Sequence, residues 1–400
     1  MAISNHLATV VKHGSKAIGF SIGHSVDVLR GRYDVVIVGA GISGAVLAER
    51  FASVCNKKVL VLEKRPHVGG ICYDFIDKHG ILVPLYGPHM FHTSYENVWR
   101  YLSAFTGWLP YEHKVKSCVD GKLVPVPVNI STVNDIFGLH IQTEEEMVRW
   151  LDENTVKIAD PQNSEEQALS RVGPILYEKM FRHYTRKQWD RWPNELDASL
   201  LKRIPVRTNF DDRYFSDTHE GVPANGYTRI FENMLGHKNI TVLTNVDFHY
   251  VKKELRNYEV LIYTGPIDAF FDYRHGKLQY RSLRFEFETY NRQYYQEHTV
   301  INYPDDEVLY ARVTEPKHQT GQKHHLTTII REYFTWDGPP YYPVPSPQNR
   351  AVYEKYRDDS AELQARGVYF TGRLAGYKHL NMDQAFKEAL DLFHGITAAG

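Results

Sequence analysis

The chain has few cysteines and no long apolar run, and each of these features narrows its class. Only three of 400 residues are cysteines (Cys55, Cys72 and Cys118), and their spacings are scattered. That pattern suits a reducing compartment and provides neither a disulfide framework nor a cysteine metal site, so we expect a cytoplasmic protein. The sequence contains no stretch of about 18 apolar residues, which predicts that it has no membrane span.

An excess of charge is also missing. The formal net charge is −1 and the sequence pI is about 7.1, so the chain provides no field for non-specific nucleic-acid binding. The chain has twenty histidines, so a metal-binding site must be considered. His89 and His92 are three residues apart, but no carboxylate or cysteine set nearby completes a tetrahedral site, and we predict no metal. The 27 tyrosines offer flat faces and hydroxyls, which suit sugar and base recognition.

Residues 33–64, YDVVIVGAGISGAVLAERFASVCNKKVLVLEK, carry the strongest local signal. An apolar β-branched run at 35–38 predicts a buried strand. Glycines with GxGxxG spacing, helical periodicity over 44–54 and a second buried strand at 59–62 follow. An acid, Glu63, comes about 20 residues after the glycines, where it can reach a ribose hydroxyl. This complete strand, turn, helix, strand and acid order predicts dinucleotide binding.

Two further features favour FAD over NAD. Gly69 and Gly70 follow the acid in KRPHVGG, and a second glycine pair lets the backbone approach a large flat cofactor. Near the C-terminus, a strand at 368–370 leads into Gly372–Arg373 and then a helix after Asn381. The first amides of that helix can point at a carbonyl edge of a flavin. The FAD-binding part is therefore predicted to be discontinuous.

The intervening segments predict two other kinds of structure. Helical patterns fill roughly 129–205, with Thr143 and Ser164 as expected N-caps. Residues 114–128 predict a hairpin around Asp120–Gly121, and alternating runs over 278–334 predict an antiparallel sheet.

We therefore predict an α/β fold: a discontinuous Rossmann-like FAD-binding domain with an inserted helical domain and an antiparallel β-sheet domain. The expected division is an N-terminal extension at 1–32, an FAD-binding domain at 33–108, 210–265 and 345–400, a helical domain with a mobile substrate loop at 129–209, and a sheet domain at 109–128 and 266–344.

Several longer motifs occur together and in order. They are YGPHMFHT (86–93), YTRKQW (184–189), LKRIPVR (201–207), YRSLRFE (280–286), YARVTEPKH (310–318), PYYPV (340–344) and GRLAGYKHLNMD (372–383). With them the chain resembles the bacterial UDP-galactopyranose mutase family over about nine-tenths of its length. The resemblance implies an isomerase that interconverts UDP-galactopyranose and UDP-galactofuranose. In it, N5 of reduced FAD is the nucleophile at the anomeric carbon and UDP is the leaving group. It also implies a homo-oligomer, with NAD(P)H as the external reductant.

The same resemblance implies roles for particular residues. It makes Arg203 and Arg312 the cations for the diphosphate, and it places His92 beside the flavin ring. The substrate-binding residues implied are Phe181, Tyr184, Thr185, Trp189, Tyr214, Tyr342, His379 and His113. The cofactor-binding residues expected are Gly39, Gly41, Ser43, Gly44, Glu63, Lys64, Gly70, His89, Arg373 and Met382.

Some alternatives stay open at this point. The aromatic and cationic stretch YTRKQWDRWP (184–193) is either a core helix end or a ligand surface. His379 and His113 depart from residues common in the family, so the sugar is either galactose or a relative of it. A flavin amine oxidase or desaturase, which shares the FAD fold, and a silent nucleotide-sugar binder are the rival classes.

Overall fold

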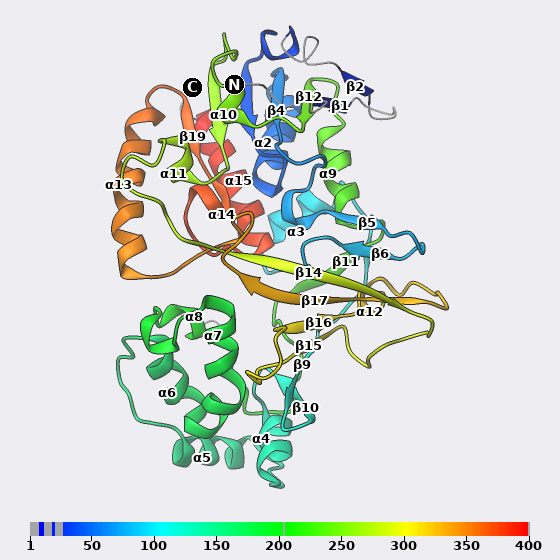
Figure 1. Ribbon diagram of the computed structural model, residues 1–400, viewed down its shortest axis with the longest axis vertical. Helices are drawn as coiled ribbons and strands as arrows, with labels where there is room; N and C mark the ends of the chain where they lie inside the picture. Colours follow the sequence, from blue (N-terminus) through cyan, green and yellow to red (C-terminus); the bar gives the residue numbers. More distant parts are fainter. Residues whose placement is uncertain (1–7, 12–17, 21–26, 203–204, 399–400) are drawn as a thin grey trace.

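The computed structural model describes residues 8–11, 18–20, 27–202 and 205–398. Figure 1 shows three parts: a layered α/β part, a long antiparallel sheet beneath it, and a group of helices beside that sheet. This is the predicted mixed α/β plan with a Rossmann-like unit, helices and an antiparallel sheet.

The first sheet has seven strands in the order β19-β13-β3-β4-β12-β1-β2. Its parallel strands are β3 (Val35–Val38), β4 (Val59–Leu62), β12 (Ile240–Thr244), β13 (Val260–Tyr263) and β19 (Val368–Phe370). The runs VVIV and VLVL are apolar throughout because helices cover both faces of this sheet.

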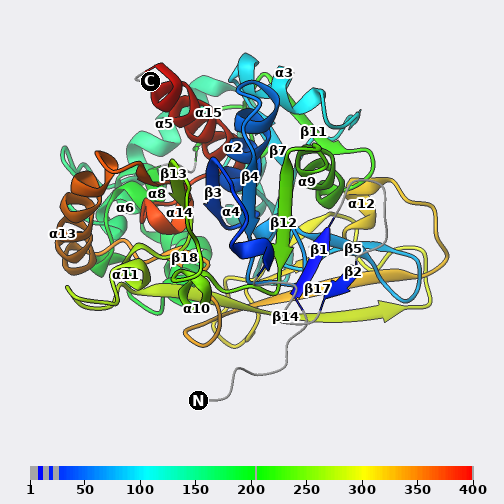
Figure 2. The same ribbon diagram turned by 90° about the horizontal axis from the view of Figure 1, so that it is seen from above.

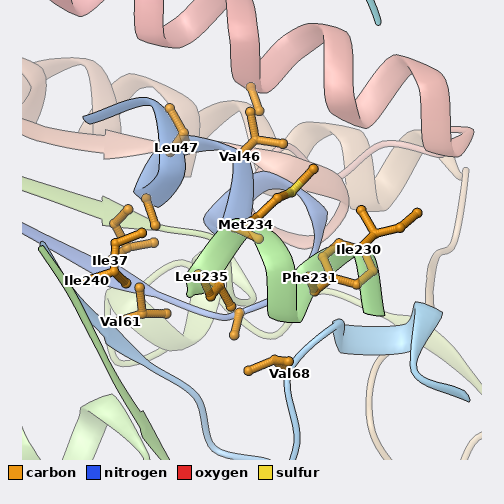
Figure 3. Close-up of a cluster of buried hydrophobic side chains, with 14 of the residues drawn as sticks. Ile37, Val46, Leu47, Val61, Val68, Ile230, Phe231, Met234, Leu235 and Ile240 are labelled. Carbon is orange, nitrogen blue, oxygen red and sulfur yellow. The ribbon is translucent and has the colours of Figure 1, made fainter. Parts of the chain in front are cut away.

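Helices α2 (Ile42–Ser53), α9 (Tyr227–Leu235) and α15 (Met382–Ala398) cover one face (Figure 2). Val46 and Leu47 of α2 meet Ile37 and Val61 of the strands, and residues of α9 close the cluster (Figure 3). The other face packs on α10 (Phe248–Val251) and α11 (Ile267–Phe270), with α13 (Pro347–Gln364) at its side. The predicted helix after Asn381 and the strand at 368–370 are confirmed.

The last two strands at one side of this sheet come from the segment predicted as an extension. β1 (Ala8–Val11) pairs antiparallel with β12, and β2 (Ile18–Phe20) pairs with β1. The other residues of 1–26 lie outside the described part of the chain. β1 therefore extends the sheet of the Rossmann-like part.

The second sheet follows the order β10-β9-β15-β16-β17-β14-β18. Its strands are β9 (Val115–Val119), β10 (Lys122–Val126), β14 (Tyr280–Tyr290), β15 (Val300–Asn302), β16 (Arg312–Thr314), β17 (Thr327–Thr335) and β18 (Tyr342–Pro343). The hairpin at Asp120–Gly121 is confirmed, with both residues at positive φ. The pairs within 278–334 are antiparallel, as alternation predicted, and β9 of the hairpin pairs in parallel with β15.

Small strands and short helices join the two sheets. β7 (Phe91–Thr93), β11 (His219–Pro223) and β8 (Trp108–Leu109) form a three-stranded sheet, and β5 (Asp74–Ile76) pairs with β6 (Leu82–Pro84). The short helices are η1 (Gly70–Cys72), α3 (Glu96–Ser103), α12 (Lys317–Thr320) and α14 (Gly372–Ala375).

The helical part comprises α4 (Ile130–Phe137), α5 (Glu144–Asn154), α6 (Ser164–Leu176), η2 (Tyr177–Arg182), α7 (His183–Trp189), η3 (Pro193–Glu195) and α8 (Ser199–Lys202). Thr143 caps α5 in a capping box, as predicted. The predicted cap Ser164 is wrong: Asn163 accepts the amide of Glu166 at 3.0 Å, while the Ser164 hydroxyl donates to the carbonyl of Asp197 at 2.6 Å.

A kink inside α6 lies just before the turns that lead to α7. Gly173 has φ +79°, and a Cβ there would lie 2.0 Å from the carbonyl oxygen of Asn154. The chain then passes through the wider π-type turns of η2 before α7 begins. This arrangement leaves Tyr177 in the core of the helical part while Phe181 and Tyr184 reach the site described next. The division of the chain into three domains is kept as a proposal.

Candidate active site

The three fingerprint glycines have different structural reasons. A Cβ on Gly39 would lie 2.2 Å from the Thr264 hydroxyl, and one on Gly44 would lie 1.9 Å from the carbonyl oxygen of Gly39. Gly44 therefore allows α2 to pack closely on β3. A Cβ on Gly41 would meet nothing nearer than 3.6 Å, at the Cα of Gly70. Protein packing does not require Gly41, which leaves its backbone open to a phosphate at the start of α2.

The predicted acid lies beside this turn. Glu63 is buried at the end of β4, and its Oε2 accepts the amide of Ala40 at 2.8 Å while Oε1 accepts that of Arg65 at 2.9 Å. Lys64 is exposed. Arg65 is the basic residue that turns inward, 3.7 Å from Glu63 and stacked over the ring of Tyr86.

The C-terminal motif closes on the same turn. A Cβ on Gly372, at φ +89°, would lie 2.9 Å from the Ser43 hydroxyl, and one on Gly70 would lie 2.9 Å from the Cα of Gly41. Arg373 donates to the carbonyl of Leu380 at 2.6 Å, just before α15 begins at Met382. These bare backbones and two helix N-termini form a continuous cradle that fits a long, flat dinucleotide with a diphosphate at its centre.

A cleft of about 530 Å³ continues from this cradle, between the helical part and the second sheet. Most of the side chains expected in the site from sequence line it. They are His89, His92, His113, Phe181, Tyr184, Thr185, Tyr214, Arg312, Tyr342, Arg373, His379 and Met382. Arg373 and Met382 line the cleft and also belong to the dinucleotide cradle, so the cradle and the cleft form one continuous site. Arg203 lies outside the described residues.

A row of polar side chains crosses the sheet at one wall of the cleft. Strand register places Ser117 opposite Asn302, Asn302 opposite Arg312, and Arg312 opposite Glu332. All four line the cleft. Opposed residues on neighbouring strands have their Cβ atoms about 5 Å apart, so β9, β15, β16 and β17 together fix the position of the Arg312 side chain.

The arginine is held from two sides. Its Nη2 donates to the Tyr184 hydroxyl at 2.9 Å, and its Nε lies 3.4 Å from Oε1 of the buried Glu332. Burial by itself would lower the pKa of Arg312, but the Glu332 carboxylate and the Tyr184 hydroxyl outweigh it and raise the pKa above its ordinary value. Arg312 is therefore a fixed cation with donors left for an anion.

Two of the cleft histidines are neutral near pH 7. Burial and the nearby Arg373 lower the pKa of His89 to about 4, and its Nδ1 lies 3.0 Å from the carbonyl of Gly87. Burial and Arg312 lower the pKa of His113 to about 3, and its Nδ1 lies 3.1 Å from the Tyr111 hydroxyl. Both rings therefore act as uncharged hydrogen-bonding groups.

A third histidine has a different environment. Nδ1 of His92 lies 2.8 Å from Oδ2 of Asp217, and its ring stacks on Phe215 with centroids 3.6 Å apart. All three side chains line the cleft.

Aromatic rings line the cleft near the C-terminal motif. Tyr342 stacks on His379 at 5.4 Å between centroids and lies under the guanidinium of Arg373. Trp189, expected at the substrate channel, is 1% exposed and lies behind Tyr342 with Leu196, Leu200 and Val344. The stretch 184–193 therefore combines the two alternatives, a ligand surface and a core helix end. Tyr184 and Thr185 face the cleft, while Trp189 lies in the core.

Sequence reasoning missed five residues of this site. Ser117, Asn302 and Glu332 depend on strand register, which no local pattern gives. Phe215 and Asp217 lie in the loop before β11. The only residue of this loop that the sequence indicated as part of the site was Tyr214.

No helix among the described residues is long and apolar enough to cross a membrane. Within the same residues, no group of three or more histidine, cysteine, aspartate or glutamate side chains could hold a metal ion.

The fold and the site define a class: a dinucleotide-binding protein of the flavoprotein type, with a cleft that offers a fixed cation and aromatic rings. Family models sharpen this, because residues 37–105 match the NAD(P)-binding Rossmann-like domain and residues 179–379 match UDP-galactopyranose mutase. The chain belongs to the UDP-galactopyranose mutase family, whose members are isomerases.

Curated relatives agree with that membership. The chain is 39% identical to a probable UDP-galactopyranose mutase of Klebsiella pneumoniae, with 89% of this chain and 93% of that protein aligned. It is 38% identical to the dTDP-fucopyranose mutase of Escherichia coli, with 89% and 96% aligned. Among solved structures, reduced UDP-galactopyranose mutase matches with a TM-score of 0.74 at 17% identity, covering 92% of this chain and 95% of that one. A putative protoporphyrinogen oxidase from Exiguobacterium matches at 0.61, with 12% identity and 92% and 99% covered, which shows a shared fold.

Proposed function

We propose that this isomerase interconverts the pyranose and furanose forms of a nucleoside-diphosphate sugar, with UDP-galactose as the first candidate. The observation that carries the proposal is Arg312, fixed between Glu332 and Tyr184 in a cleft that is continuous with the dinucleotide cradle. A sugar nucleotide has a diphosphate beside its anomeric carbon. A fixed arginine near a cofactor cradle holds such a diphosphate next to the reacting carbon.

The cofactor proposed is FAD in its reduced form, in the cradle formed by Gly41, Ser43, Gly70 and Arg373, with Glu63 for the ribose. When bound, reduced FAD supplies a nucleophilic nitrogen for the anomeric carbon, so the protein needs no side-chain nucleophile. We also propose NAD(P)H as the external reductant, a cytoplasmic location and a homo-oligomeric state.

The chain's own residues bind, orient and screen the substrate. Arg312 stabilises the charge that grows on the diphosphate as the sugar–phosphate bond breaks. Arg203 is proposed as its partner, on the segment that follows α8. Phe181 and Tyr184 offer flat faces to the base, while Tyr342 and His379 lie near Arg373 for contacts to phosphate or sugar.

A second substrate class deserves the same test. The cleft contains an apolar patch from β9, β10, β15 and the helical part, formed by Val115, Val126, Val300, Met180 and Phe181. Such a patch accepts the methyl group of thymine or of a 6-deoxy sugar as readily as it accepts bare uracil. The relative named dTDP-fucopyranose mutase is 38% identical and the UDP-galactopyranose relative 39% identical, so identity does not choose between them.

The testing experiment is anaerobic turnover of UDP-galactofuranose and dTDP-fucofuranose, each with and without dithionite, followed by chromatography of the sugar nucleotides. Conversion to the pyranose only with reduced flavin supports the proposal, and the ratio of the two kcat/KM values assigns the substrate. A flavin-loaded protein that converts neither sugar, and that consumes oxygen with an amine, would replace the mutase with the oxidase.

A further inference from the structure

A histidine and an acid meet at the wall of the cleft, brought together by the pairing of β7 with β11. His92 is the middle residue of β7 and lies opposite Glu220 of β11. Asp217 lies just before β11, and its Oδ2 reaches Nδ1 of His92 at 2.8 Å. Two segments 125 residues apart in the chain thus form one contact, and neither segment predicts it alone.

The ring of His92 is held in place and in plane. Oδ1 of Asp217 accepts the Ser94 hydroxyl at 2.9 Å, which fixes the carboxylate. Phe215 stacks on the imidazole at 3.6 Å between centroids, with 13° between the planes. One contact sets the rotation of the ring and the other sets its tilt. A side chain that must present a hydrogen-bonding atom in one direction needs such contacts to hold its ring in one orientation.

The contact also fixes which nitrogen has the proton. An ionised carboxylate only accepts hydrogen bonds, so Nδ1 of a neutral His92 must carry the hydrogen. Nε2 is then an acceptor. No residue in the described part of the chain hydrogen-bonds Nε2, and the ring lines the cleft. This nitrogen is therefore available to a bound molecule.

Other charged groups surround the pair without replacing Asp217. Asp383, at the start of α15, is buried with no hydrogen-bond partner for its Oδ1 among the described residues, and burial raises its pKa. Burial also raises the pKa of Glu220, whose Oε1 accepts the amide of His113 at 2.6 Å. The neutral His113 lies near both His92 and the cation Arg312. Among the charged side chains that the structure describes, Asp217 alone hydrogen-bonds the imidazole.

We propose that Asp217 is a positioning residue, which keeps the His92 proton on Nδ1 and presents Nε2 as the acceptor for a hydroxyl of the bound sugar. This inference rests on the proposed function for the identity of the ligand. A change of ring size makes and breaks bonds at sugar hydroxyls, so a fixed acceptor for one of them favours the reactive arrangement.

The test uses FAD-loaded protein with Asp217→Ala and Asp217→Asn, and ¹⁵N-histidine NMR with His92→Gln to assign the ring. Wild type should show a hydrogen on Nδ1 of His92. Asp217→Ala should move it to Nε2, the form that a free imidazole prefers. In anaerobic turnover, kcat should fall on the order of 10- to 100-fold, as when a functional histidine loses its carboxylate partner, while KM changes little.

Glu96→Gln is the matched control. Glu96 contacts Nε2 of His219 at 2.8 Å outside the cleft, so its loss should leave kcat and the His92 spectrum unchanged. Asp217→Asn keeps the shape of the side chain and replaces the alanine variant in the test if that variant does not fold. The kcat of Asp217→Asn should also fall. A wild-type hydrogen on Nε2, or Asp217 variants with unchanged kcat, would overturn the inference. Wild-type protein without turnover would instead refute the proposed function, and the spectrum would still test the tautomer.

Discussion

Oε1 of Glu332 lies 3.4 Å from Nε of Arg312, and the two residues face each other across neighbouring strands at the wall of the cleft. Burial raises the pKa of Glu332 and Arg312 lowers it. Glu332 is buried and Arg312 is partly buried, so each charge carries a desolvation cost unless the other is present. The pair is therefore a structural unit that also holds a cation where a diphosphate can reach it.

That double role predicts two separable effects of Arg312→Ala. Turnover should fall by about 10- to 150-fold, because a charge-assisted contact is worth roughly 1.5–3 kcal/mol. Stability should fall by about 3 kcal/mol, because the Glu332 charge is left without its partner. Turnover assays and urea unfolding measure the two effects.

The double variant Arg312→Ala/Glu332→Gln separates these roles. Removing the orphaned charge should restore most of the lost stability and none of the turnover. If turnover returned together with stability, Arg312 would have only a structural role.

The buried histidines predict an acid-sensitive fold. The pKa of His113 in the folded protein is about 3, below the value of about 6.5 in an unfolded chain. Between these values the unfolded state binds more protons, so stability rises with pH over this window and is lost as pH falls below about 6.5. His113→Asn should reduce this slope by up to about 1.4 kcal/mol per pH unit.

Urea unfolding at pH 7, 6 and 5 checks the slope. His140→Asn, at an exposed position, is the control and should leave it unchanged. Equal slopes for wild type and His113→Asn would mean that the pKa of His113 is the same in the folded and the unfolded protein.

Local chemistry explains how much of this molecule could be predicted. The strands at 35–38 and 59–62, the glycine turn and the helix after Asn381 follow from short-range patterns, and the structure shows them. Residues such as Glu332 and Asp217 could not be predicted, because they acquire their partners by strand register between distant segments. Trp189 was expected at the substrate channel and lies in the core instead, for a related reason. Helical spacing predicts which residues share a helix face, but only tertiary packing determines that Tyr342 lies between Trp189 and the cleft.

The fingerprint glycines predict opposite outcomes for the same substitution. Gly44→Ala should prevent stable folding, since its Cβ would lie 1.9 Å from a backbone oxygen. Gly41→Ala should fold with little loss of stability, because its Cβ would make only ordinary contact at 3.6 Å, yet it should bind FAD weakly. Circular dichroism and the flavin absorbance of purified protein distinguish the two cases. A Gly41→Ala protein that still binds FAD fully would show that the diphosphate of the cofactor does not lie against this turn.

The stacked pair of His379 and Tyr342 allows a test of the departure from the family pattern. The rings are 5.4 Å apart and 16° from parallel, a geometry that a tyrosine at 379 can also adopt. A tyrosine reaches further and carries a hydroxyl donor, so His379→Tyr should preserve or raise activity on UDP-galactose. Steady-state kinetics with UDP-galactofuranose measure this, with His140→Tyr as a surface control. Complete loss of activity in properly folded His379→Tyr protein would mean that the imidazole makes a contact with the substrate that a phenol cannot, and that the histidine belongs to a different sugar nucleotide.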